Sequence, residues 1–183
     1  FHEYAHARVA YLLGDYTSYY QNRMNLNPFN HLDPFGTFAL YFLGFGWAKP
    51  VPVLMQNLKN PKSDMMMIAM AGPASNMFLA MVASIIYRLN FYFQLSEEVI
   101  IPLEIFIQIN IVLAIFNLLP LNPLDGSRIL PLIVKNPRTL YNIEVYGPRV
   151  LIGLIILNLI GIPILSTIIL TPVSIIFYLL TGA

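Results

Sequence analysis

The sequence predicts an all-α polytopic membrane protein with about 4–6 transmembrane or re-entrant helices and a small membrane-embedded β element over about residues 35–53. Composition is the first reason: 57% of the 183 residues are hydrophobic and 10% are charged, whereas a soluble domain carries about 25% charged residues. The second reason is a series of long apolar stretches that end at proline, glycine or charged residues. Because so few charged side chains do not cover a water-soluble core, we expect the bilayer to be the solvent.

The N-terminal part is expected to enter the bilayer without crossing it. Residues 5–13 are apolar except for His6 and Arg8, and a run this short is less than half of the about 20 residues that cross a bilayer as a helix. We therefore interpret the chain as a fragment that lacks the first span and the start of this helix. The aromatic run 35–48 has the length of a re-entrant segment. Two prolines in residues 49–53 disfavour helix there, because proline fixes φ and has no N–H, and together the two runs predict the β element.

Three longer apolar stretches follow along the chain. Residues 65–87 are long enough to span the bilayer with some tilt, and residues 100–119 form a second span that runs into a segment rich in proline. Residues 150–183 carry no charge at all. Gly161 and Pro163 either divide this last stretch into two short helices or kink one long helix.

The charged residues predict an orientation and exclude one class of function. Lysine and arginine gather in two loops that two spans separate, so both loops lie on one side, and the positive-inside rule makes that side cytoplasmic. Glu97 and Glu98 lie in the loop on the opposite side. A net charge of +1 without a basic stripe excludes a nucleic-acid-binding protein. The basic loop residues are Lys49, Lys59, Lys62, Lys135, Arg138 and Arg149.

Residues 2–6 read His-Glu-Tyr-Ala-His, the HExxH pattern. His2 and His6 lie four positions apart, so a helix places both imidazoles on one face, where they can hold a single zinc ion. Glu3 projects beside them. The chain has no cysteine, so any metal must be held by histidine, aspartate or glutamate. We favour a functional role over a mere helix interface, because ionisable groups in an apolar helix are costly without partners.

Zinc in a catalytic site usually takes three protein ligands, so the pattern requires a third. Asp125 lies where a hydrophobic span ends and prolines open the helix, which can aim a buried carboxylate at a metal. A turn aspartate in a Leu-Asp-Gly loop is the alternative role for this residue. His31 and Asp33 are more typical of loop stabilisation than of metal binding. The full set of candidates is Asp15, His31, Asp33, Asp64, Asp125 and the later glutamates.

Asn76 is a polar amide inside the first complete span. Gly72, Asn76 and Ala80 repeat every four residues, a pattern typical of close helix packing. The amide either forms an interhelical hydrogen bond or donates to a substrate carbonyl or oxyanion.

Taken together, these motifs resemble the site-2 protease family of intramembrane zinc metalloproteases, in the short branch without a PDZ domain. The resemblance rests on the HExxH pattern, on Gly72-Pro73-x-x-Asn76 and on Asn-Pro-Leu-Asp-Gly at 122–126, and it covers about residues 1–130. It implies that His2, His6 and Asp125 bind one zinc ion. It also implies that Glu3 is the catalytic glutamate and that Asn76 contacts the substrate backbone or the tetrahedral intermediate.

The same resemblance implies a function and a location. We expect one membrane-embedded metalloprotease domain over 1–183 that hydrolyses peptide bonds within or near transmembrane segments of membrane protein substrates, as in regulated intramembrane proteolysis. We expect it to be a multi-pass protein in the cell membrane of a prokaryote, surrounded by lipid, with its active site facing the cytoplasm. A membrane metal transporter and a catalytically silent membrane adaptor are the alternative functions.

Overall fold

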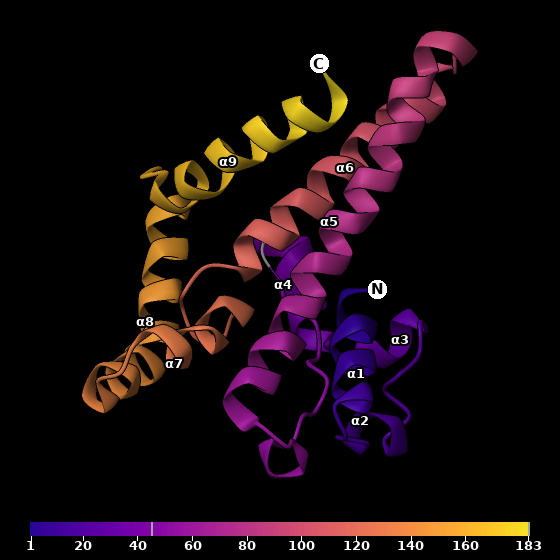
Figure 1. Cartoon of the computed structure of the whole chain (residues 1–183). Coiled ribbons are helices and arrows are strands. Elements are labelled where there is room, and N and C mark those ends of the chain that lie inside the picture. Colours follow the sequence, from indigo (N-terminus) through magenta and orange to yellow (C-terminus); the bar gives the residue numbers. More distant parts are fainter. Residues whose placement is uncertain (45, 183) are drawn as a thin grey trace. The chain divides into compact units, whose positions relative to one another are not determined.

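The computed structural model describes residues 1–44 and 46–182 as helices joined by loops (Figure 1). Within these residues the β structure consists of one isolated antiparallel bridge, between Leu32 and Ala48. The chain divides into two compact units, Phe1–Gly72 and Pro73–Ala183. Helix α5, Pro61–Phe93, begins in the first unit and continues into the second.

The first unit has a small core around the first helix and the start of α5. Ala10, Leu58 and Ile68 are buried there, and four partly buried apolar side chains pack against them. Burial of this kind stabilises by about 25 cal/mol per Å² of apolar surface. The helices of this unit, besides the start of α5, are α1 His2–Leu12, α2 Thr17–Tyr20, α3 Pro28–His31, α4 Pro34–Leu43 and the 3₁₀ turn η1 Met55–Asn57.

The β element expected over 35–53 is wrong for the part that forms α4. Asp33 caps this helix, because its carboxylate accepts a hydrogen bond of 2.8 Å from the N–H of Gly36. Pro34 occupies the first turn, where its missing N–H does no harm. Gly44 ends the helix in the left-handed conformation at φ 69°. These local capping signals outweigh the aromatic and glycine-rich composition that suggested an extended chain.

Residues 49–54 are non-helical, as the two prolines predict. The N–H of Lys49 donates to the carbonyl of His31 at 2.8 Å, and side chains hold the residues that follow. Arg23 is buried and donates to the carbonyl oxygens of Lys49 at 2.6 Å and Pro50 at 3.3 Å. Ser18 donates to the carbonyl of Pro52 at 2.6 Å. Because the prolines supply no N–H, this segment cannot satisfy its own backbone as a regular element does.

Asp15 holds the C-terminal end of the same segment. Its side chain is 1% exposed and accepts hydrogen bonds from the N–H of Leu54 at 2.7 Å, from the Asn57 side chain at 2.7 Å, and from the backbone and hydroxyl of Thr17. Burial alone raises the pKa of this carboxyl, but the four hydrogen bonds outweigh it and lower the pKa below the ordinary value of 3.8. A charged Asp15 therefore joins α1, α2 and η1.

The second unit packs its helices around one apolar cluster. Helix α9 contacts both α6 and α8. The buried residues of the cluster are Ala80, Ala83, Ile107, Ile111, Leu165, Ile169 and Val173. Besides the rest of α5, the elements are α6 Glu97–Asn117, η2 Asp125–Arg128, α7 Leu130–Ile133, α8 Pro137–Leu159 and α9 Ile164–Thr181.

Helices α5, α6, α8 and α9 are each long and apolar enough to cross a membrane. The chain is therefore a multi-pass, helical membrane protein. The last apolar stretch forms two helices, because Gly161 adopts φ 91° and Pro163 follows before α9 begins. Helix α8 starts well before this stretch, since Asn136 caps it by accepting from the N–H of Arg138 and Pro137 fills the first turn.

Candidate metal centre

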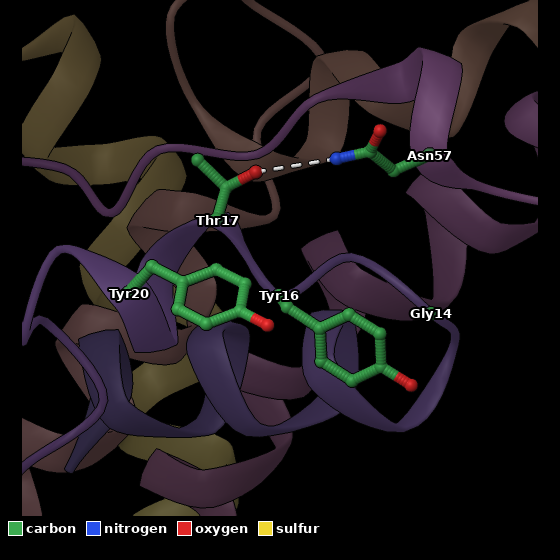
Figure 2. A pocket seen from close by; sticks show the side chains of 5 residues that line it. All are labelled: Gly14, Tyr16, Thr17, Tyr20 and Asn57. Atoms are coloured by element: carbon green, nitrogen blue, oxygen red, sulfur yellow. Dashed lines mark hydrogen bonds between the residues drawn. The ribbon is translucent and has the colours of Figure 1, made fainter.

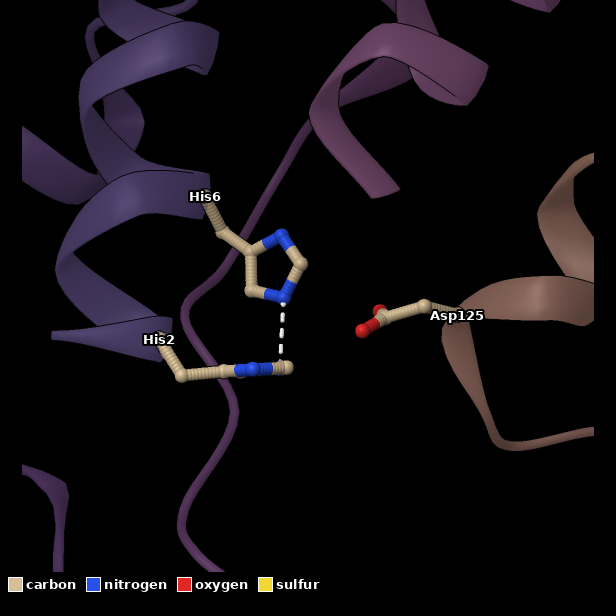
Figure 3. A group of neighbouring side chains, drawn as sticks. All are labelled: His2, His6 and Asp125. Carbon is tan, nitrogen blue, oxygen red and sulfur yellow. Dashed lines mark hydrogen bonds between the residues drawn. The ribbon is translucent and has the colours of Figure 1, made fainter. Parts of the chain in front are cut away.

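The two histidines of the HExxH pattern lie on one turn of α1, as the four-residue spacing predicts. Figure 3 shows their rings at the start of that helix, with a dashed line between them. Nε2 of His2 and Nε2 of His6 are 3.0 Å apart, and the ring planes make an angle of 82°. Two nitrogen ligands of one tetrahedral zinc ion, with Zn–N of about 2.0 Å, lie about 3.3 Å apart. The pair thus has the spacing of two ligands of one ion.

A backbone carbonyl fixes the tautomer of His6. Its Nδ1 lies 2.7 Å from the carbonyl oxygen of Ile68, in a buried contact. A carbonyl oxygen only accepts, so Nδ1 carries the proton and Nε2 keeps its lone pair. A hydrogen bond from the non-ligating ring nitrogen is how metal-binding histidines are usually oriented.

Gly72 of α5 leaves the space in front of these nitrogens clear. A Cβ atom at this position would lie 2.5 Å from Nε2 of His2 and closer still to Nε2 of His6. Real side chains do not approach this closely, so only glycine leaves both nitrogens where they are. Two imidazole nitrogens beside a position that only glycine can occupy are a donor set that fits zinc.

Glu3 lies on the same helix and is half-buried. Its Oε2 accepts a hydrogen bond of 3.0 Å from the N–H of Val51, in the segment that Arg23 and Ser18 hold. A backbone donor therefore fixes the direction of the Glu3 carboxylate.

The other candidate ligands of the first unit have local structural roles. Asp15 binds the neighbouring segments and Asp33 caps α4, as described above. His31 approaches the carbonyl of Asn25 at 2.8 Å through Nε2, a contact within its own loop. Asp64 accepts from the N–H of Asn60 at 2.8 Å, at the start of α5. The loop-stabilising roles predicted for His31 and Asp33 are confirmed.

Asp125 lies in the second unit, as the first residue of η2 (Figure 3). The helix before it ends at Asn117, so the prediction that the helix opens ahead of Asp125 is confirmed. Gly126 allows the loop to fold back on that helix end, because a Cβ there would lie 2.5 Å from the carbonyl oxygen of Leu119. The aspartate thus follows a tight loop, and its role as a ligand stays a prediction.

Asn76 lies in the second unit, on α5, and is 3% exposed. Its Nδ2 donates to Oδ1 of Asn110 on α6 at 3.0 Å. Asn110 is itself buried and donates to the carbonyl of Phe106 at 2.9 Å, which fixes which atom of its amide faces Asn76. Sequence reasoning missed Asn110, although a polar amide in the middle of the next span was a visible signal. The interhelical hydrogen bond weighed for Asn76 is present, and a catalytic role stays a prediction.

An open cavity of about 260 Å³ lies beside α2 (Figure 2). It is lined by Gly14, Tyr16, Thr17, Tyr20 and Asn57, and Asn57 donates to the Thr17 hydroxyl at 3.3 Å. None of these residues belongs to the HExxH pattern. The cavity is therefore distinct from the imidazole pair.

Comparisons with known proteins agree with the motifs. Residues 91–160, which include α6, η2, α7 and α8, match Peptidase family M50. A protein of Bacillus subtilis (strain 168) with the name "Putative zinc metalloprotease YwhC" is 44% identical over 135 residues, which cover 70% of this chain and 62% of the relative. The chain thus spans less than two thirds of that relative's length. No solved structure matches the chain. The chain belongs to peptidase family M50, the family of the site-2 proteases that its motifs resemble.

Proposed function

We propose that the chain is the catalytic domain of an intramembrane zinc metalloprotease that hydrolyses peptide bonds within or near transmembrane segments of other membrane proteins. The observation that carries this proposal is the imidazole pair of α1, with Nε2 atoms 3.0 Å apart beside a glycine that leaves no room for a side chain. Family membership, the name of the relative and four apolar helices support it.

We assign His2, His6 and Asp125 as the ligands of one zinc ion per chain. Two neutral nitrogens and a carboxylate are a usual donor set for catalytic zinc and leave a position for water. Bound zinc would lower the pKa of that water toward about 7 and polarise the scissile carbonyl. The protein holds His6 in the required tautomer through the carbonyl of Ile68.

Glu3 is the general base and acid of the proposed reaction. It takes a proton from the attacking water and returns it to the leaving amine of the cleaved peptide. The N–H of Val51 holds one carboxylate oxygen, so the carboxylate does not need to be oriented at each turnover.

Asn76 contacts the substrate backbone or the developing oxyanion. A donor of this kind contributes about 3 kcal/mol to the transition state in other hydrolases. Asn110 accepts one of the two N–H groups of the Asn76 amide, which orients the amide as a whole.

The substrate is a transmembrane protein or peptide, since a site carried on apolar helices is reached through lipid. The active site faces the cytoplasm of a prokaryotic cell membrane in this proposal, and the positive charge in the loops supports that orientation. Cleavage in this setting is the chemistry of regulated intramembrane proteolysis.

The test is cleavage of a membrane-spanning test substrate by the zinc-loaded protein in vesicles, compared with Glu3→Gln. We expect the parent to cleave and the variant to bind zinc without cleaving. Equal cleavage by both would contradict the role of Glu3. Transport of zinc into the vesicles without any cleavage would favour a metal transporter, and neither activity would favour a silent adaptor.

A further inference from the structure

Helix α8 contains a break in its hydrogen bonding at Pro148. Proline has no N–H, so the carbonyl four residues earlier, that of Glu144, receives no donor from the helix. A carbonyl that loses its helical donor is stabilised by a hydrogen-bond partner from elsewhere.

Asn122 supplies that partner. Its Nδ2 donates to the carbonyl oxygen of Glu144 at 3.2 Å. Gly147, one residue before the proline, is buried against the same loop: a Cβ there would lie 2.8 Å from the backbone nitrogen of Asn122 and 3.2 Å from its Cβ. The backbones of helix and loop are therefore in direct contact at the one carbonyl that the proline leaves free.

The loop that makes this contact carries Asp125. Asn122 precedes the aspartate by three residues, and Leu124 between them is buried. On the other side of the aspartate, Gly126 packs on the carbonyls at the end of α6, and the Ser127 hydroxyl donates to the carbonyl of Leu124 at 2.7 Å. Asp125 is thus held between two anchors, one on α6 and one on α8.

We propose that Asn122, Gly147 and Pro148 form a docking contact that fixes the Asp125 loop on α8, with Asn122 as a positioning residue for Asp125. The contact itself follows from the geometry of the second unit. Its effect on the metal rests on the proposed function, in which Asp125 is a zinc ligand.

The contact predicts an unusual pair of effects for Pro148→Ala. Alanine restores the N–H that bonds to the Glu144 carbonyl, so α8 becomes a better helix and its unfolding temperature rises. The same N–H displaces Asn122, so the loop loosens and zinc affinity falls roughly 10-fold or more, as when supporting partners of a metal ligand are removed elsewhere. A proline that only kinks the helix would move stability alone.

The test is a double-mutant cycle of Asn122→Ala and Pro148→Ala in the full chain, measured by zinc affinity in chelator competition and by unfolding temperature without zinc. We expect Asn122→Ala to lower both quantities in the parent and to change neither in the Pro148→Ala background. Pro172→Ala in α9 and Gly153→Ala in α8, where a Cβ meets no atom within 4 Å, are the matched controls and should leave zinc affinity unchanged.

The outcomes separate the docking contact from the proposed function. Additive effects on the unfolding temperature would overturn the contact, whatever zinc does. Coupled stability with unchanged zinc affinity, in a protein where Asp125→Ala does lower zinc affinity, would overturn the positioning role of Asn122. Unchanged zinc affinity in Asp125→Ala would instead overturn Asp125 as a ligand, and the positioning role with it, while the stability cycle still decides the contact.

Discussion

The imidazole pair of α1 and the Asp125 loop are held in place by different means. The histidines lie four residues apart on a helix, so the backbone period aligns them, and one carbonyl and one glycine complete the arrangement. The aspartate lies in a loop whose position depends on contacts with two helices. A helix turn aligns two ligands through its own backbone geometry. The position of a ligand on a loop depends instead on contacts with residues that are distant in the sequence.

This difference suggests where each region is vulnerable. The histidine pair should lose zinc when a side chain occupies the space in front of its nitrogens, because the helix itself keeps the two residues aligned. The Asp125 loop should lose its position when a residue that anchors it is removed, even where that residue does not contact the metal. The predictions that follow test this contrast, from the largest expected effect to the smallest.

Gly72→Ala should disable the histidine pair without unfolding its helix. The added Cβ overlaps both Nε2 positions and turns the rings away, so zinc affinity should fall about 100-fold or more. Alanine is the better helix former by about 1 kcal/mol, so the unfolding temperature should not fall with it. Zinc competition and thermal unfolding measure the two effects, with Gly153→Ala as the control. Normal zinc affinity in Gly72→Ala would contradict the close approach.

Asn76→Ala should lower turnover about 100-fold at unchanged zinc content, since a lost oxyanion donor costs about 3 kcal/mol. Asn110→Ala removes only the orienting partner and should lower turnover by less. Rates per folded molecule and unfolding temperatures should be measured for both variants. If stability falls while the rate per folded molecule stays constant, Asn76 acts only in helix packing.

Asp15→Asn should destabilise the first unit by about 2 kcal/mol at neutral pH, because hydrogen bonds to a charged acceptor become bonds to a neutral one. The pKa of Asp15 is lowered in the folded state, so its contribution is complete above the ordinary value of 3.8 and is lost as pH falls through the lower folded value. Unfolding followed from pH 7 down to pH 2 should show a smaller acid loss in the variant than in the parent. The exposed Glu97→Gln is the control, and parallel pH curves for Asp15→Asn and the parent would refute the hydrogen-bonded carboxylate.

Asp33→Ala should have the smallest effect, about 1 kcal/mol, through the lost cap of α4. Asp33→Asn keeps an acceptor for the N–H of Gly36 and should retain most of the stability. Amide hydrogen exchange over residues 34–43 measures the difference. Equal exchange in the parent and in Asp33→Ala would show that packing, not the cap, holds this helix.

The parts that the sequence predicts well are those set by local periodicity or length. The four-residue spacing places His2 and His6 on one face, and runs of about 20 apolar residues become long helices. Helix α4 differs from the predicted β element although its signals, Asp33-Pro34 and Gly44, are local, because these capping residues outweigh the aromatic and glycine-rich composition.

The contacts that support the site could not be predicted, because they join residues distant in the sequence. Nothing in the linear pattern pairs Gly72 with the imidazoles, Asn110 with Asn76, or Asn122 with the carbonyl that Pro148 leaves free. Helix and span patterns predict which side chains share a face, but not which atoms on two elements come within hydrogen-bonding distance.

Zinc stoichiometry and affinity, measured side by side for the parent, His6→Ala, Asp125→Ala and Glu3→Gln, test the central assignment most directly. We predict one zinc per chain in the parent and in Glu3→Gln, and loss of tight binding in the two ligand variants. Parent-like zinc binding by Asp125→Ala or His6→Ala would contradict the assignment of His2, His6 and Asp125 as the metal ligands.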